Sequence, residues 1–161
     1  MENGNTPVSL EEQIQWLVDR AQISDLLNSF AAALDSKNVS AYVNNYTDDG
    51  VLVLPNPASP KESIEVKRDV MKDFVSKGLM EAYSATHHIS SNHQISIDGD
   101  LATSRSYLQA VHVRKHPLDH WDVGGWYDCR YVRTAEGWKF KQVKLSAVWL
   151  SGEPGSIEPE S

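Results

Sequence analysis

The stretch HHISSNHQISIDGDLATSRSYLQAVHV, residues 87–113, contains two runs of alternating apolar and polar side chains on either side of an Asp-Gly-Asp turn. Alternation with a period of two is typical of β-strands, and an Asp-Gly pair between two such runs indicates a hairpin. Two more strands are predicted in WYDCRYVRT (126–134) and WKFKQVKLSAVWL (138–150), after a predicted loop HPLDHWDVGG (116–125). The second half of the chain therefore predicts four strands that form an antiparallel meander.

Helical periodicity precedes these strands. Ser9 and Glu12 have capping-box spacing, and apolar residues then recur every three or four positions until Asp35 is reached. This pattern predicts either one long helix or two shorter helices with a kink between them.

Two shorter helices are predicted next. The first covers residues 39–46 and ends at the turn-rich TDDG before the strand VLVLP (51–55). The second covers residues 66–75, after a loop at 55–63, and Ser63 is its predicted cap. Helices that precede a meander indicate an α+β fold, in which the helices cover one face of the sheet.

The composition agrees with one compact domain and argues against several classes of partner. The 161 residues are 40% hydrophobic, with a formal net charge of −7 and no Lys/Arg cluster, so we expect no nucleic acid partner. Cys129 is the sole cysteine, which fits a reducing compartment. Without a secretory signal or a long apolar run, a cytoplasmic protein with no membrane partner is expected. The domain is predicted at 9–150, between a flexible N-terminus (1–8) and a flexible C-terminal tail (151–161).

One face of the predicted strand 101–113 carries mostly small side chains: Ala102, Ser104, Ser106, Leu108, Ala110 and His112. Small residues on a core-facing strand leave volume unfilled, and an imidazole on the same face favours a ligand cavity over a packed interior. The alternative is that this face is exposed to solvent and that the face of Arg105, Tyr107, Gln109 and Val111 is buried.

His88 and Asp35 are the candidate acid–base residues. His88 shares its strand face with Ser90, Asn92 and Gln94, which suit a polar ligand better than a dry core. A histidine can act as acid or base near neutral pH, and a carboxylate on its other ring nitrogen fixes the tautomer. Asp35, at a helix end where a negative charge gains nothing locally, could be that carboxylate. The alternatives are a structural histidine and a solvated helix end.

The predicted loop contains His116, Asp119, His120 and Asp122, residue types that can bind metals. Their spacing defines no coordination geometry, so we predict a solvated loop, no metal site and no cofactor. The chain also lacks G-x-G-x-x-G, P-loop, H-E-x-x-H and G-x-S-x-G motifs, which argues against dinucleotide, nucleotide, zincin and serine-hydrolase functions.

The order of elements, together with LDSKN (34–38), THHISSNHQISIDGDLATSRSYL (86–108) and GGWYDCRYVRTAEGWKF (124–140), resembles the SnoaL-like branch of the nuclear transport factor 2-like superfamily. The resemblance covers residues 9–150 and implies a cone-shaped, curved antiparallel sheet wrapped by three N-terminal helices around a deep pocket. The chain is most similar to the group that contains scytalone dehydratase, bile acid 7α-dehydratase and hexachlorocyclohexane dehydrochlorinase.

This resemblance implies that Asp35 and His88 are catalytic and that His112 is a second active-site histidine, which we expect to protonate a departing oxygen. The carbonyl-polarising tyrosines of scytalone dehydratase correspond here to Leu34 and Leu54, and no arginine follows Arg133. The electrophilic contact would then come from Tyr46, Tyr127 or Ser106. Apolar side chains expected to line the pocket are Phe30, Leu54 and Trp149.

The resulting hypothesis is a cofactor-free dehydratase. His88, oriented by Asp35, would remove a proton next to an activating group, and a hydroxide would depart to leave a double bond. The expected substrate is a cyclic, hydroxylated, moderately apolar small molecule of polyketide or steroid type. An isomerase or polyketide cyclase using the same pocket, or a non-catalytic ligand-binding or assembly domain, is the alternative. The resemblance also implies a homo-oligomer, with a trimer favoured over a dimer.

Overall fold

The computed structural model describes residues 9–56, 59–115 and 119–152. Three helices precede the long strands, and a short π-helical segment (Ser76–Met80) follows the third helix. The elements are α1 (Leu10–Asp35), α2 (Val39–Asn44), β1 (Tyr46–Asn56), β2 (Ser59–Lys67), α3 (Arg68–Val75), β3 (Ala85–Asp98), β4 (Leu101–Val113), β5 (His120–Thr134) and β6 (Gly137–Ser151). The predicted flexible N-terminus, 1–8, lies outside the described residues, as does the predicted flexible tail, 151–161, beyond residue 152. Ser151, the first residue of that predicted tail, is the last residue of β6.

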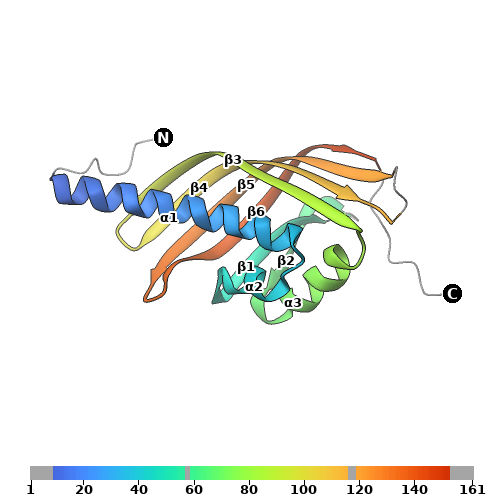
Figure 1. The fold of residues 1–161 in the computed structure, drawn as a ribbon, viewed down its shortest axis with the longest axis horizontal. Coiled ribbons are helices and arrows are strands. Elements are labelled where there is room, and N and C mark those ends of the chain that lie inside the picture. Colours follow the sequence, from blue (N-terminus) through green and yellow to red (C-terminus); the bar gives the residue numbers. More distant parts are fainter. Residues whose placement is uncertain (1–8, 57–58, 116–118, 153–161) are drawn as a thin grey trace.

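The six strands form one curved, open sheet in the order β2-β1-β6-β5-β4-β3. Strands β3 to β6 are an antiparallel meander, which confirms the prediction from the second half of the sequence. The sheet as a whole is mixed rather than antiparallel, because β1 pairs parallel with β6 and antiparallel with β2. Helix α1 runs along one face of the long strands, and α2 and α3 lie beside β1 and β2 (Figure 1). The α+β prediction is therefore confirmed.

Helix α1 is one continuous helix of 26 residues. Its start has the predicted capping box: Ser9 Oγ accepts from the Glu12 backbone N–H at 3.2 Å, and Glu12 Oε2 accepts from the Ser9 backbone N–H at 2.9 Å. These two bonds satisfy N–H groups that a helix start otherwise leaves unpaired. Among the described residues, no helix combines the length and apolar character that a membrane span requires.

The prediction for residues 55–75 was partly wrong. Residues 59–67 form strand β2, and α3 begins only at Arg68, with Lys67 at its N-cap, so Ser63 caps nothing. Ile64 and Val66 alternate with polar or charged residues, and both pair opposite β1. Two apolar residues are too few to distinguish this strand alternation from the edge of a helical stripe.

The predicted loop 116–125 is also shorter than expected, because β5 already begins at His120. The Gly124-Gly125 pair indicates a turn in sequence but lies within the strand. A Cβ at Gly125 would come within 2.0 Å of the Ser146 carbonyl oxygen, so this glycine permits a close approach of two backbones.

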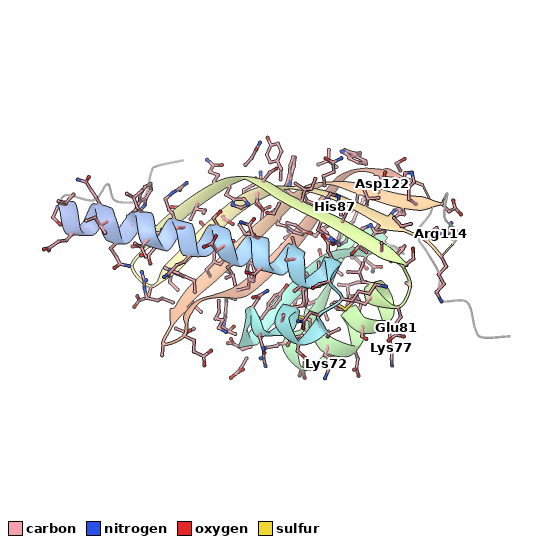
Figure 2. The ribbon with its side chains drawn as sticks, in the orientation of Figure 1. Lys72, Lys77, Glu81, His87, Arg114 and Asp122 are labelled. Atoms are coloured by element: carbon pink, nitrogen blue, oxygen red, sulfur yellow. The ribbon has the colours of Figure 1, made fainter. Side chains whose placement is uncertain are left out.

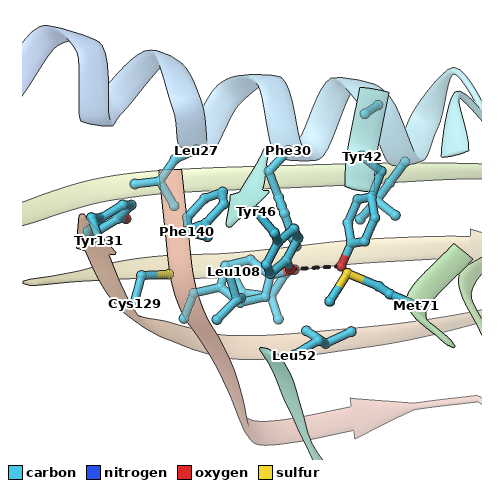
Figure 3. Close-up of a cluster of buried hydrophobic side chains, with 14 of the residues drawn as sticks. Leu27, Phe30, Tyr42, Tyr46, Leu52, Met71, Leu108, Cys129, Tyr131 and Phe140 are labelled. Atoms are coloured by element: carbon cyan, nitrogen blue, oxygen red, sulfur yellow. Dashed lines mark hydrogen bonds between the residues drawn. The ribbon is translucent and has the colours of Figure 1, made fainter. Parts of the chain in front are cut away.

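The core lies between α1 and the inner face of the sheet (Figure 3). Tyr42, Tyr131 and Phe140 are its largest fully buried side chains. The predicted small-residue face of β4 points inward from Ala102 to His112, and the opposite face does not, which excludes the solvent-facing alternative.

A buried ion pair joins α1 to the far end of β5. Asp19, 2% exposed, accepts bonds of 2.6 and 2.8 Å from the Arg133 guanidinium and one of 3.0 Å from Trp138 Nε1. The hydrogen bonds from Arg133 hold the pKa of Asp19 below its ordinary value despite the opposing effect of burial.

Candidate active site

A cavity of about 470 Å³ lies between the end of α1, α3 and the inner face of β4 to β6. This volume is in the range of small-molecule sites. Among the described residues, no Lys, Arg, Asp or Glu side chain lines it. Charged side chains such as Lys72, Lys77 and Glu81 are exposed on α3 and the segment after it (Figure 2). The cavity is therefore apolar, with a small polar set: Tyr42, Tyr83, His88, His112, Trp121 and Tyr127.

Asp35 faces strand β3 instead of solvent. Its Oδ1 lies 2.7 Å from His88 Nδ1 and accepts from Thr86 Oγ1 at 3.0 Å, and its Oδ2 accepts from the His88 backbone N–H at 2.9 Å. Thr86 and His88 point the same way because alternate residues of a strand share a face. Three hydrogen bonds thus fix the Asp35 carboxylate beside the first residues of β3.

The charge state of Asp35 follows from these contacts. Partial burial pushes the pKa of Asp35 up, but hydrogen bonds from His88 and Thr86 outweigh burial and hold the pKa below its ordinary value. An ionised carboxylate only accepts hydrogen bonds, so His88 Nδ1 carries the ring proton. Nε2 of neutral His88 is therefore unprotonated, as a general base requires.

His112 lies beside His88 at the cavity wall, with ring centroids 5.2 Å apart and planes nearly perpendicular. Its Nδ1 is 3.1 Å from the Trp121 carbonyl oxygen, which can only accept, so Nδ1 carries the proton. Burial, and secondarily the neighbouring His88, lower the pKa of His112 to about 4. A neutral His112 with a bare Nε2 accepts hydrogen bonds, which argues against the expected role as proton donor to a leaving group.

Aromatic rings enclose the His112 end of the cavity. The Trp121 ring centroid is 4.5 Å from that of His112, and the Tyr83 ring is 5.1 Å from His112 and nearly parallel to Trp121. Lys37 Nζ donates to the Tyr83 backbone carbonyl at 2.7 Å, which ties this wall to the end of α1.

The structure separates the residues predicted to bind substrate into two groups. Those that line the cavity are Phe30, Leu54 and Tyr127. Those that lie outside its lining are Tyr46, Ser106 and Trp149.

Packing explains the second group. The Tyr46 hydroxyl is 3.0 Å from that of Tyr42, within the core. Ser106 is fully buried and accepts a hydrogen bond from Ser90. Trp149 is 46% exposed. These contacts leave Tyr127 alone among the three predicted electrophilic contacts to line the cavity.

Sequence reasoning missed Thr86, Tyr83 and Trp121. Thr86 shares the parity of His88, so the strand pattern could have indicated it. Trp121 shares the parity of Tyr127 on β5 but fell in the predicted loop. Tyr83 precedes β3 in a segment without periodicity, and only the tertiary structure reveals its position.

The polar residues of the predicted loop form local pairs. His120 Nδ1 lies 2.8 Å from Asp122, and Asp119 accepts from Arg114 at 3.3 Å, while His116 lies outside the described residues. Within the described ranges, no group of three or more His, Cys, Asp or Glu side chains is arranged to hold a metal ion.

Comparison with known proteins identifies the fold family. Residues 15–144 match the SnoaL-like domain. The Kfla4162 protein of Kribbella flavida is 30% identical, with a TM-score of 0.75 over 83% of this chain and 93% of its own. A Novosphingobium aromaticivorans protein provisionally named an aromatic ring hydroxylase is 26% identical, with a TM-score of 0.75 over 85% of this chain and 94% of its own. No curated protein matches.

More distant structures share the fold alone. A protein provisionally named scytalone dehydratase from Novosphingobium aromaticivorans is 20% identical, with a TM-score of 0.75 over 90% of this chain and 97% of its own. Hexachlorocyclohexane dehydrochlorinases are also among these neighbours, one of them at 15% identity. The match to the SnoaL-like domain covers most of the chain and agrees with the observed sheet and helices. The chain belongs to the SnoaL-like domain family, within the nuclear transport factor 2-like superfamily.

Proposed function

We propose that this protein is a dehydratase-type lyase in which side chains supply the acid–base chemistry. The observation that carries this proposal is the 2.7 Å contact between Asp35 and His88 Nδ1 at the wall of an apolar cavity. This arrangement fixes the tautomer of His88 and leaves Nε2 free to accept a proton. The fold of neighbours named as a dehydratase and a dehydrochlorinase is consistent with it, since both names denote eliminations.

The proposed reaction begins at a C–H bond next to a carbonyl group. His88 Nε2 takes the proton, and the Asp35 carboxylate stabilises the imidazolium that forms. The electron pair of the C–H bond becomes part of a new double bond as the C–O bond of the β-hydroxyl breaks. His88 then returns its proton to the departing hydroxide, so that water leaves and the neutral imidazole is restored.

His112 serves as a positioning residue in this scheme. Its unprotonated Nε2 accepts a hydrogen bond from the substrate hydroxyl and holds it on the side of the imidazole that delivers the proton. Its pKa of about 4 keeps it neutral at physiological pH, so it does not compete for the proton that His88 removes.

The lining suggests the substrate class. An apolar cavity of about 470 Å³ with aromatic walls suits a ring-shaped, hydroxylated, moderately apolar molecule of polyketide or steroid type. An isomerase or cyclase would start with the same proton transfer, and product mass separates the three reactions, because elimination alone releases water.

The test is turnover of a panel of cyclic β-hydroxy ketones, followed by the ultraviolet absorbance of the conjugated product. His88→Ala and Asp35→Asn are expected to lower kcat by about 10²–10⁴-fold. His87→Ala is the matched control, because His87 is the preceding residue of the same strand and is exposed. Full activity of His88→Ala would contradict the proposal.

A further inference from the structure

Tyr127 is a buried phenol that has no hydrogen-bond partner among the described residues. It is 4% exposed and lines the cavity, and its ring makes an edge contact with Phe30 at 5.3 Å. The neighbouring cavity tyrosine, Tyr42, differs in this respect, because its hydroxyl lies 3.0 Å from that of Tyr46. Buried hydroxyls are normally paired, and an unpaired one in a cavity wall is available to a ligand.

The charge state of Tyr127 suits a donor. Burial raises the pKa of Tyr127 well above its ordinary value, and the negative charge of Asp35 acts in the same direction. The phenol therefore keeps its proton throughout the physiological range and is a neutral hydrogen-bond donor.

The strand register orders the polar groups along the cavity. Tyr127 pairs opposite Ser106 of β4, and His88 pairs opposite Ala110 of the same strand. His112 is the next inward-facing residue of β4 after Ala110. His88 thus lies between the level of Tyr127 and the level of His112.

We infer that Tyr127 is a further catalytic residue, which donates a hydrogen bond to the carbonyl oxygen that activates the substrate C–H. This inference rests on the proposed function. The order Tyr127, His88, His112 matches the order of groups in a β-hydroxy ketone: carbonyl oxygen, carbon that loses the proton, carbon that bears the hydroxyl. As the proton moves to His88, negative charge develops on the carbonyl oxygen, where the Tyr127 bond becomes stronger.

The other groups at the cavity are less suited to donate a hydrogen bond to the carbonyl oxygen. Leu34 and Leu54 line the cavity, but their side chains have no hydrogen-bond donor. Trp121 Nε1 is also buried without a partner within the described ranges, but Trp121 pairs opposite His112, at the end where the leaving hydroxyl lies.

A neutral donor also defines the substrate. With no cation in the described lining, a bound carboxylate would remain uncompensated in an apolar site, at considerable cost. The cavity, with Tyr127 as its neutral hydrogen-bond donor, is therefore expected to bind an uncharged ketone or aldehyde in preference to a carboxylate.

The test compares binding of 2-tetralone with that of tetralin, its hydrocarbon counterpart, to the wild-type chain and to Tyr127→Phe. The wild type is expected to prefer the ketone, and Tyr127→Phe to lose about tenfold in ketone affinity with hydrocarbon affinity unchanged. The infrared carbonyl stretch of the bound ketone should lie at lower frequency in the wild type than in the variant. Tyr107→Phe, at an exposed tyrosine of β4 outside the cavity lining, is the matched control and should keep the preference.

Each outcome decides the inference. Equal binding of the two probes by the wild type, no binding of either, or an unchanged ketone preference in Tyr127→Phe overturns it. Loss of that preference in Tyr127→Phe supports it even if His88→Ala proves fully active, a result that would contradict the proposed base alone. With a turned-over substrate, Tyr127→Phe should lower kcat by about 10²–10³-fold and raise KM by at most about tenfold.

Discussion

The carboxylate of Asp35 lies 2.7 Å from Nδ1 of His88, although the two residues are 53 positions apart in the chain. Asp35 is the last residue of α1, and His88 lies near the start of β3. The same carboxylate also accepts the His88 backbone N–H, so the contact both orients the imidazole and docks the helix end on the strand. A change at Asp35 should therefore be detectable in the tautomer of His88 as well as in activity.

Asp35→Asn is expected to reverse the tautomer of His88 while the fold is kept. The His88 backbone N–H is donated to Oδ2, so the amide keeps its oxygen at that position and places its NH₂ at the Oδ1 position. The NH₂ then donates to His88 Nδ1 and faces the Thr86 hydroxyl, the imidazole proton moves to Nε2, and the base is lost. Nitrogen-15 NMR of labelled histidine reports the tautomer directly, and thermal unfolding reports the fold. An unchanged Nδ1–H tautomer in the variant would show that Asp35 does not control His88.

His112 is expected to make the free energy of unfolding depend on pH between about 6.5 and 4. Its folded pKa is about 4, below the ordinary 6.5, so as pH falls the unfolded chain binds a proton before the folded chain does. The stabilisation is complete above pH 6.5 and decreases by about 3 kcal/mol as pH falls to 4.

Urea unfolding of the wild type and of His112→Gln at several pH values checks this prediction. Carboxylates and His93, whose pKa is also lowered by burial, contribute to both chains. The difference between the two curves therefore isolates His112, and parallel curves would mean that its pKa is not depressed.

The sequence predicts the elements whose pattern is long and periodic. The stripe of α1, with its capping box at Ser9, and the alternation of β4 extend over many residues, so local preference and tertiary structure agree. In β3 a register shift between Ser91 and Gln94 interrupts the alternation, so Asn92 and Gln94, predicted on the face of His88, are exposed. The sequence also predicts Asp35 and His88 as candidate site residues. A negative charge at the end of a helix is not stabilised locally, and a polar strand face does not suit a dry core, so both features point to another role.

The missed features depend on contacts that are distant in the chain. Strand β2 was expected as loop and helix because Ile64 and Val66 give too short an alternation. The parallel pairing of β1 with β6 has no local pattern at all. Trp121 was assigned to a loop because the glycine pair that follows it indicates a turn in the sequence. Only the close approach of β5 to β6 explains why glycine is needed there within a strand.

Arg133→Gln is expected to destabilise the fold far more than Arg105→Gln, although both arginines make bidentate bonds to an aspartate. Asp19 is buried, so loss of Arg133 leaves an uncompensated charge and costs about 2–4 kcal/mol, less than for a fully buried pair because Arg133 is partly exposed. The Arg105–Asp128 pair is solvent-exposed, so its loss is expected to have little effect on the free energy of unfolding. Denaturant unfolding of both variants measures the contrast, and similar costs would contradict the importance of burial.

Gly125→Ala is expected to destabilise the protein strongly, whereas Gly78→Ala is expected to be neutral or slightly stabilising. A Cβ at Gly125 would meet the Ser146 carbonyl oxygen at 2.0 Å, and backbone in the middle of a paired sheet cannot move aside without breaking the β5–β6 ladder. A Cβ at Gly78 meets nothing within 4 Å, so the main effect there is reduced freedom of the unfolded chain, worth about 0.4–1 kcal/mol. Thermal unfolding of the two variants provides the comparison. A Gly125→Ala chain with wild-type stability would contradict the close approach of the β5 and β6 backbones at this position.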